Sequence, residues 1–145
     1  MESAYFNPTW VRKSARRHGL STDASFRFER GIDPCGQIDA LKKAAIMARE
    51  LSGCKISMDI VDVKSAEAKP FAVDLSYSYV HDMVGKTIPT DVIKEIVTSL
   101  EMQIVNETEQ GLSLLVPPYR VDVQRPCDVV EDVLRIYGYN NVEIP

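Results

Sequence analysis

Four carboxylates near the end of the chain have the residue types and spacing that could hold a cation. They fall within the stretch PPYRVDVQRPCDVVEDVLRIYGY, residues 117–139, and are Asp122, Asp128, Glu131 and Asp132. Pro126 suits the first turn of a helix, because the N–H that it lacks has no partner there. Acids spaced three and four residues apart on such a helix share one stripe. Two interpretations stay open. Acids near a helix start are stabilised by its dipole and are solvated, or they bind Mg²⁺ through oxygen ligands and waters. Spacing alone favours solvated acids.

The residues before this helix indicate the domain that positions it. Its other face is apolar at helical spacing, with Val129, Val130, Val133, Leu134 and Tyr137. Upstream we expect a short strand at 71–75, a helical turn at 77–83, and a helix capped by Thr90 that buries Val92, Ile93, Ile96, Val97 and Leu100. Strands at 103–106 and 112–116 around a polar turn predict a hairpin. Helices followed by a hairpin and another helix indicate a winged-helix-like domain. The second helix of this domain carries few basic residues, so a scaffold role is favoured over DNA recognition.

The first part of the chain contains a basic cluster. Asn7-Pro8 predicts the start of a helix and Gly19 its end. The cluster consists of Arg12, Lys13, Arg16, Arg17 and His18. Basic residues at the end of a helix complement its dipole and are solvated, which is the favoured interpretation. The alternative is a surface that faces RNA phosphates.

Residues 22–34 have neither helical nor strand periodicity, a composition typical of a site or of a loop that is held down. Within them Glu29 and Arg30 are expected to form an ion pair. A helix at 35–51 is expected to bury Ile38, Leu41, Ala45 and Ala48, and alternation at 55–63 predicts a strand. The polar segment 64–70 ends in proline and indicates a linker. We therefore predict one domain at 1–66 and a second at 67–145.

Composition indicates a globular chain, with 45% hydrophobic residues, 26% charged residues and a net charge of −4. The acidity argues against a general phosphate-binding surface but permits a local basic patch. Cys35, Cys54 and Cys127 are widely spaced, which excludes a zinc ribbon and fits a reducing compartment. No apolar run approaches the roughly 20 residues that cross a bilayer, and no signal peptide is recognisable. We expect a cytoplasmic protein without membrane contact, whose sequence begins as if taken from a longer chain.

Two motifs together resemble a known family. ESAYFNP (2–8) followed by GLSTDASFRFERGIDP (19–34) resembles the editing domain of the beta chain of bacterial phenylalanine–tRNA ligases. LLVPPYRVDVQRPCDVVEDVLRIYGYNNVEIP (114–145) resembles the end of the winged-helix-like domain that follows it. The order and separation of the motifs also agree. The resemblance implies an α+β chain, in which part of an α/β editing domain at 1–66 precedes a small winged-helix-like domain with a β-hairpin at 67–145.

The resemblance also implies roles for individual residues. Glu2, Thr22 and Ala24 correspond to residues of the editing pocket, which hydrolyses Tyr-tRNA(Phe). Mg²⁺ would be shared with the alpha subunit, and its ligands correspond to Asp122, Asp128, Glu131 and Asp132; the last is more often Glu in the family. With this resemblance the metal interpretation overtakes solvated acids, although only for the assembled enzyme. The implied partners are the alpha subunit, in an alpha2beta2 tetramer, and tRNA(Phe), with ATP and phenylalanine handled by the alpha subunit.

The resemblance implies that aminoacylation belongs to the alpha subunit and that part of the editing domain precedes Glu2, so the chain alone is expected neither to charge nor to deacylate tRNA. No nucleophile–base arrangement is recognisable in the chain, which agrees with an editing site that positions a water. A positioned water would suffice to hydrolyse an ester. Two other function classes stay open. One is a free-standing winged-helix module that binds nucleic acid, although no specific DNA site is expected. The other is a structural interaction module in which the acids are solvated.

Overall fold

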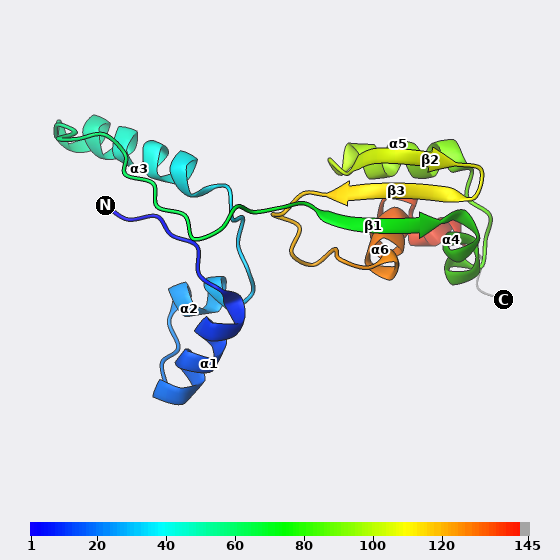
Figure 1. Ribbon diagram of the computed structural model, residues 1–145, viewed down its shortest axis with the longest axis horizontal. Coiled ribbons are helices and arrows are strands. Elements are labelled where there is room, and N and C mark those ends of the chain that lie inside the picture. The colour runs from blue at the N-terminus through cyan, green and yellow to red at the C-terminus, as the bar shows by residue number, and fades with distance from the viewer. Residues whose placement is uncertain (143–145) are drawn as a thin grey trace. The chain divides into compact units, whose positions relative to one another are not determined.

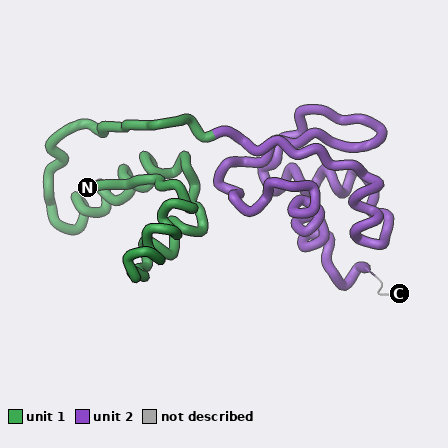
Figure 2. Tube along the Cα trace, turned by 60° about the horizontal axis from the view of Figure 1, so that its bottom comes forward, with its two compact units in different colours: residues 1–68 green, residues 69–145 purple. Residues whose placement is uncertain are grey.

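The computed structural model describes residues 1–142, and the chain divides into two compact units (Figure 1, Figure 2). Unit 1 comprises residues 1–68, and unit 2 begins at Lys69. Unit 1 contains three helices: α1 (Pro8–His18), α2 (Asp23–Phe28) and α3 (Gln37–Ser52).

The ends of α1 follow the sequence prediction. Asn7 Oδ1 accepts a hydrogen bond from the Trp10 backbone N–H at 3.2 Å, which satisfies one of the free donors at the helix start. Gly19 ends the helix at φ 64°, a left-handed conformation that glycine adopts without a steric cost. The start and end of α1 are thus confirmed.

Residues 22–34 differ from the expectation of an aperiodic segment, because α2 forms within them. The Thr22 side chain accepts from the Ser25 backbone N–H, and the Ser25 hydroxyl lies 2.9 Å from the Thr22 backbone N–H. This capping box satisfies two backbone donors and starts the helix without an apolar repeat. The expected contact between Glu29 and Arg30 is present at 3.4 Å.

Two predictions for unit 1 are wrong. The expected buried face of α3 is only partly covered, since Ile38, Leu41, Ala45 and Ala48 are half-buried and no residue of the helix is buried. Residues 55–63 form no strand, and their side chains are exposed. A strand needs a neighbour for its backbone N–H and C=O groups, and unit 1 has no other strand among the residues described. Alternating side chains therefore did not suffice to make a strand.

Unit 2 is an α+β domain built on a three-stranded antiparallel sheet, which confirms the predicted fold class. Strands β1 (Phe71–Ser76), β2 (Gln103–Thr108) and β3 (Gly111–Val116) lie in the order β1-β3-β2. The predicted hairpin is β2–β3, and β1 pairs with β3, which is therefore the central strand. The helices are α4 (Tyr77–Val84), α5 (Thr90–Ser99) and α6 (Pro126–Tyr137), followed by the 3₁₀ helix η1 (Tyr139–Asn141). Pro89, rather than Thr90, occupies the N-cap of α5.

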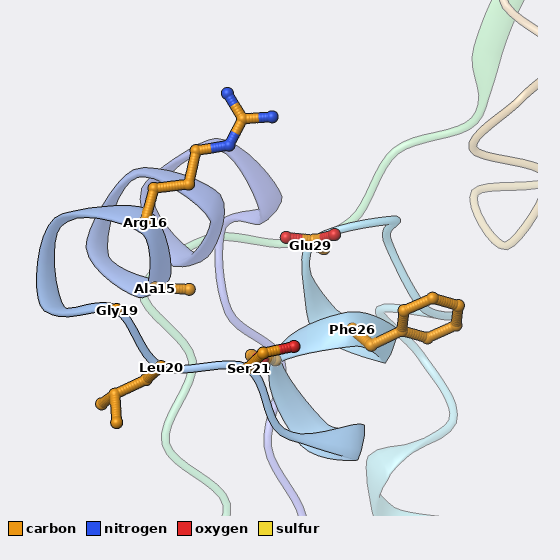
Figure 3. A pocket seen from close by; sticks show the side chains of 8 residues that line it. Ala15, Arg16, Gly19, Leu20, Ser21, Phe26 and Glu29 are labelled. Atoms are coloured by element: carbon orange, nitrogen blue, oxygen red, sulfur yellow. The ribbon is translucent and has the colours of Figure 1, made fainter.

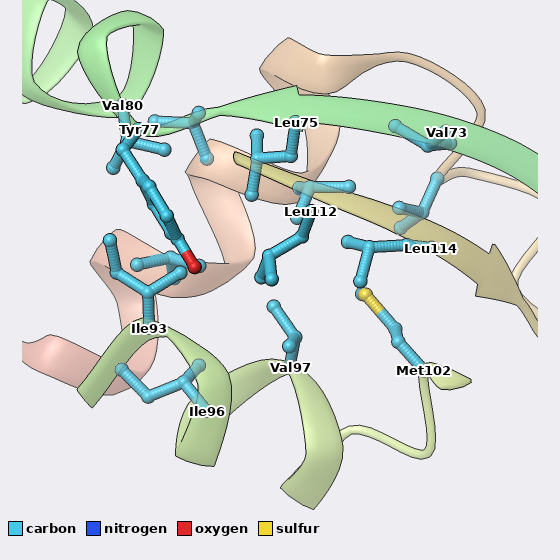
Figure 4. Close-up of a cluster of buried hydrophobic side chains, with 14 of the residues drawn as sticks. Val73, Leu75, Tyr77, Val80, Ile93, Ile96, Val97, Met102, Leu112 and Leu114 are labelled. Carbon is cyan, nitrogen blue, oxygen red and sulfur yellow. The ribbon is translucent and has the colours of Figure 1, made fainter. Parts of the chain in front are cut away.

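The core of unit 2 lies between one face of the sheet and the helices. Side chains of β1 and β3 alternate between buried and less buried, so Val73, Leu75, Leu112 and Leu114 point to the same side. Figure 4 shows these side chains meeting residues of α5, such as Val97. The predicted apolar face of α6 is confirmed: Val129, Val130 and Val133 are buried, and Leu134 and Tyr137 pack against the cluster.

Candidate functional site

Asp128 lies in the first turn of α6 and caps that helix. Its Oδ2 accepts hydrogen bonds from the backbone N–H groups of Gln124 at 3.2 Å and Arg125 at 2.9 Å. The Arg125 guanidinium donates to the same carboxylate, at 2.8 Å to Oδ1. Hydrogen bonding from the Arg125 side chain, with the backbone donors, lowers the pKa of Asp128 to about 2. The carboxylate is therefore ionised at neutral pH and fully engaged within its own turn.

Asp132 lies one turn further along α6 and is buried, with 6% of its surface exposed. The Arg120 Nη2 donates to Asp132 Oδ2 at 2.6 Å and reaches Asp122 Oδ2 at 3.5 Å. The sequence predicted Asp132 on the solvated stripe of the helix, and this placement is wrong. A carboxylate is retained in an apolar surrounding only where a cation and hydrogen bonds compensate its lost hydration, and Arg120 supplies both.

Glu131 lies on the exposed side of α6. Its Oε1 accepts from Arg135 Nη2 at 2.6 Å, an i,i+4 pair in which both side chains are more than half exposed. All four acidic residues singled out by the sequence therefore contact an arginine. In residues 1–142 no three His, Cys, Asp or Glu side chains gather closely enough to hold a metal ion. The arrangement in this chain by itself does not fit a Mg²⁺ site.

Sequence reasoning missed Arg120 and Arg125 as partners of these acids. Arg120 and Arg125 stand two and three residues before Asp122 and Asp128, so their spacing was a usable signal for both ion pairs. The contact between Arg120 and Asp132 has no such local signal, because it depends on how the loop after β3 returns to α6.

The three residues predicted for an editing pocket lie in unit 1, and all three are exposed. The Thr22 Oγ1 accepts from Ser25 N at 3.1 Å, so one of its lone pairs already serves the cap of α2. Ala24 follows in the first turn of that helix, and Glu2 precedes α1 in an irregular segment.

Unit 1 has a surface hollow of about 280 Å³ between the end of α1 and α2 (Figure 3). Its lining residues are close in sequence to Thr22 and Ala24. Its lining includes Ala15, Arg16, Ser21, Ser25 and Glu29. Neither Glu2, Thr22 nor Ala24 lines the hollow. A second hollow in unit 2, of about 340 Å³, lies at the end of α4 and is lined by polar residues around Lys86.

Comparisons with known proteins match both parts of the chain. Residues 1–53 match the B3/4 domain family, and residues 73–139 match the tRNA synthetase B5 domain family. Along all 145 residues the chain is 68% identical to the phenylalanine–tRNA ligase beta subunits of Bacteroides fragilis and Bacteroides thetaiotaomicron. It is 46% identical over 144 residues to that of Porphyromonas gingivalis. The chain belongs to the phenylalanine–tRNA ligase beta-subunit family.

The two family models follow each other in this beta-subunit segment as the two motifs predicted. The chain is covered completely by both Bacteroides relatives and spans 18% of their length. No helix in the described part of the chain is long and apolar enough to cross a membrane.

Proposed function

We propose that this chain is a segment of the beta subunit of a phenylalanine–tRNA ligase and functions as part of the assembled enzyme. With the alpha subunit, in an alpha2beta2 tetramer, the enzyme would attach phenylalanine to tRNA(Phe) with ATP and hydrolyse mischarged Tyr-tRNA(Phe). The observation that carries this proposal is the 68% identity with two Bacteroides beta subunits along the entire chain. Unit 1 would contribute to editing and unit 2 would act as a scaffold.

Editing is needed for a physical reason. A pocket shaped for phenylalanine rejects tyrosine poorly unless the added hydroxyl is excluded, so a second site that hydrolyses the wrong ester restores accuracy. Glu2 is the proposed acceptor for the phenolic hydroxyl, and Thr22 and Ala24 are the proposed pocket wall. Ala24 is small and exposed in this chain, so its surface is open to a ligand or to another part of the enzyme.

Ala24→Trp in the assembled alpha–beta enzyme tests the pocket. We expect loss of Tyr-tRNA(Phe) hydrolysis with unchanged phenylalanine charging, because an indole would fill the space of the tyrosyl ring. The matched control is Ala44→Trp, which places the same side chain at an exposed position of α3. Unchanged hydrolysis in Ala24→Trp, or equal loss in the control, refutes the proposed wall.

The chain alone is proposed to be inactive in both reactions. Glu2, Thr22 and Ala24 are exposed, whereas editing of an ester requires a site that holds the substrate and a water in fixed geometry. Incubation of the purified chain with Tyr-tRNA(Phe) and with the charging substrates should give neither free tyrosine nor Phe-tRNA. Release of tyrosine above the uncatalysed rate would overturn this part.

The Mg²⁺ site remains a proposal for the assembled enzyme only. Its proposed ligands, Asp122, Asp128, Glu131 and Asp132, each contact an arginine in this chain, so a shared site would require those contacts to change when the alpha subunit binds. The test is the metal content of the assembled enzyme with Glu131→Gln, a position whose exposed ion pair contributes little to folding. Reduced Mg²⁺ supports the site, and unchanged Mg²⁺ removes Glu131 from it.

A free-standing DNA-binding module is the weaker candidate. Residues 69–145 contain six lysines and arginines against twelve aspartates and glutamates, a net charge of −6. DNA-binding domains neutralise phosphates with an excess of basic residues, which this unit lacks.

A further inference from the structure

The charge of the chain is divided unequally between its two units. Residues 1–68 contain eleven lysines and arginines against nine aspartates and glutamates, a net charge of +2, whereas the remaining residues carry −6. Within unit 1 the helix α1 contains four lysines and arginines and no acidic residue. The overall acidity of the chain therefore conceals a local positive field at this helix.

The cations of α1 lie on one side of the helix. Residues three and four apart are neighbours on a helix surface, so Lys13 lies beside both Arg16 and Arg17. The α1 basic face is defined here as these three residues, all of them exposed. The opposite side contains Val11 and Ala15, which are half-buried.

The α1 basic face is not neutralised from within the protein. In residues 1–142 no carboxylate lies within 4.0 Å of Lys13, Arg16 or Arg17, although such pairs do form elsewhere in the chain. The neighbouring Arg12 is used differently, since its Nη2 donates to the Glu29 backbone oxygen at 2.9 Å and ties α1 to the end of α2.

Unit 2 shows the contrast. Arg120, Arg125 and Arg135 each donate to an aspartate or glutamate at 2.8 Å or less. These three arginines of unit 2 are therefore paired, whereas Lys13, Arg16 and Arg17 have no carboxylate partner in the described residues and can contact a ligand.

An aromatic ring stands at the edge of the same face. Trp10 is 66% exposed, and Lys13 Nζ lies 5.2 Å from the centre of its ring. An exposed indole next to cations without a carboxylate partner offers a ligand an aromatic face beside positive charge. Cations that contact phosphates, next to an exposed ring on which a base can stack, form the combination that binds single-stranded nucleic acid.

We propose that the α1 basic face binds the phosphate backbone of single-stranded RNA, with Trp10 stacking on a base. The inference rests on the proposed function in one respect, because the substrate in that function is tRNA(Phe), an RNA with an unpaired end. An acidic protein segment would also be attracted by the cations, but it offers no ring to stack on Trp10, so RNA is the better fit.

Trp10 is the sole tryptophan of the chain, so its fluorescence can report binding at this face. A short oligouridylate is titrated into the full chain while Trp10 fluorescence is followed. We expect saturable quenching because of the stacked base. Each neutralised phosphate of a single strand contributes about −0.7 to the slope of log affinity against log salt, so three cations predict about −2 and an approximately 20-fold loss of affinity for a fourfold increase in salt.

Arg16→Gln combined with Arg17→Gln should reduce that slope to about −0.7, leaving an approximately 3-fold loss over the same salt range. The matched control is Lys42→Gln combined with Lys43→Gln, which removes the same charge from exposed positions of α3 and should leave the slope unchanged. Far-UV circular dichroism identifies any variant that has lost its helices. In that case, the single change Arg17→Gln replaces the double variant, with an expected slope of about −1.4.

Three results would overturn the proposal: no quenching by RNA, an equal loss of salt dependence in the α3 control, or equal Trp10 quenching by polyglutamate, which has no bases. The charging of tRNA(Phe) by the assembled enzyme is measured in parallel. Absent charging counts against the proposed function. If charging is intact and the variant Arg16→Gln with Arg17→Gln binds RNA as the wild type does, the result refutes RNA binding by the α1 basic face and leaves the proposed function standing.

Discussion

Replacing Asp132 by Asn removes a charge at a buried position and leaves the size of the side chain unchanged. Asp132 is the one charged residue that is buried in the described part of the chain, and Arg120 Nη2 lies 2.6 Å from its Oδ2. The variant keeps an oxygen that can accept from Arg120. It loses the negative charge that compensates the guanidinium, so the measured effect reports the electrostatic part of the contact.

The expected magnitude follows from the burial of both partners. Breaking a fully buried ion pair by removing one partner costs about 3–5 kcal/mol. Here Arg120 keeps 19% of its side chain exposed and has Asp122 at 3.5 Å as a second carboxylate. We therefore expect a loss of about 2–3 kcal/mol in the free energy of unfolding, below the range for full burial. With a urea m-value of about 1 kcal/mol/M for a small domain, the midpoint falls by about 2–3 M.

Urea unfolding of the full chain, followed by far-UV circular dichroism, measures this change. The cooperative transition reports unit 2, because all buried apolar residues of the described chain lie there. Glu131→Gln is the control, since it breaks a pair of equal length, 2.6 Å, on the solvent side of the same helix. Exposed pairs contribute about 0.2–1 kcal/mol. Equal effects of the two variants would refute the assignment of Asp132 as a buried, compensated charge.

Three further predictions concern unit 2. The pKa of Asp128 lies at about 2, below its ordinary 3.8, so its contribution to stability is complete above pH 3.8 and is lost as the pH falls towards 2; Asp128→Asn should flatten the stability profile in that window, measured by urea midpoints at each pH. Tyr77→Phe should stabilise by about 1 kcal/mol in thermal unfolding, because the buried Tyr77 hydroxyl has no hydrogen-bond partner among the described residues; a loss of stability would reveal a partner. Gly111→Ala should lower the free energy of unfolding in urea by about 1–3 kcal/mol, since an added Cβ would collide with the Leu75 carbonyl oxygen. In Gly85→Ala the added Cβ meets no atom within 4 Å, so this variant measures the cost of a positive φ without a collision.

The sequence predicted unit 2 well because its local signals and its packing agree. Pro126 marks the start of α6, the apolar spacing of that helix matches its buried face, and the polar turn before Gly111 marks the hairpin. Each element buries the face that its own periodicity indicated. Local preference and tertiary contact then favour the same structure, which is the condition under which pattern reasoning succeeds.

Unit 1 was predicted less well because the sequence patterns of its segments were not matched by packing against other elements. Alternation at 55–63 indicated a strand, but a strand is stabilised by a neighbouring strand and no sequence pattern shows whether one is present. The short helix α2 was missed for the opposite reason. It depends on a hydrogen-bonded cap between Thr22 and Ser25 rather than on an apolar repeat.

The candidate site shows the same limit for charges. Spacing placed the acids of α6 on one solvated stripe, whereas Asp132 is buried and Glu131 is exposed. Spacing also could not tell whether a metal, water or an arginine compensates these acids. The structure provides arginines, and Arg120 reaches Asp132 from twelve residues away. These arginines compensate the acids of α6, although unit 2 as a whole keeps a net charge of −6. The cations of α1 have no carboxylate partner in the described residues. We therefore assign the proposed binding of a polyanion to α1 in unit 1 and not to α6 in unit 2. Neutralising Arg16 and Arg17 should therefore change RNA binding without moving the urea midpoint of unit 2, and a shift of that midpoint would refute this division of roles.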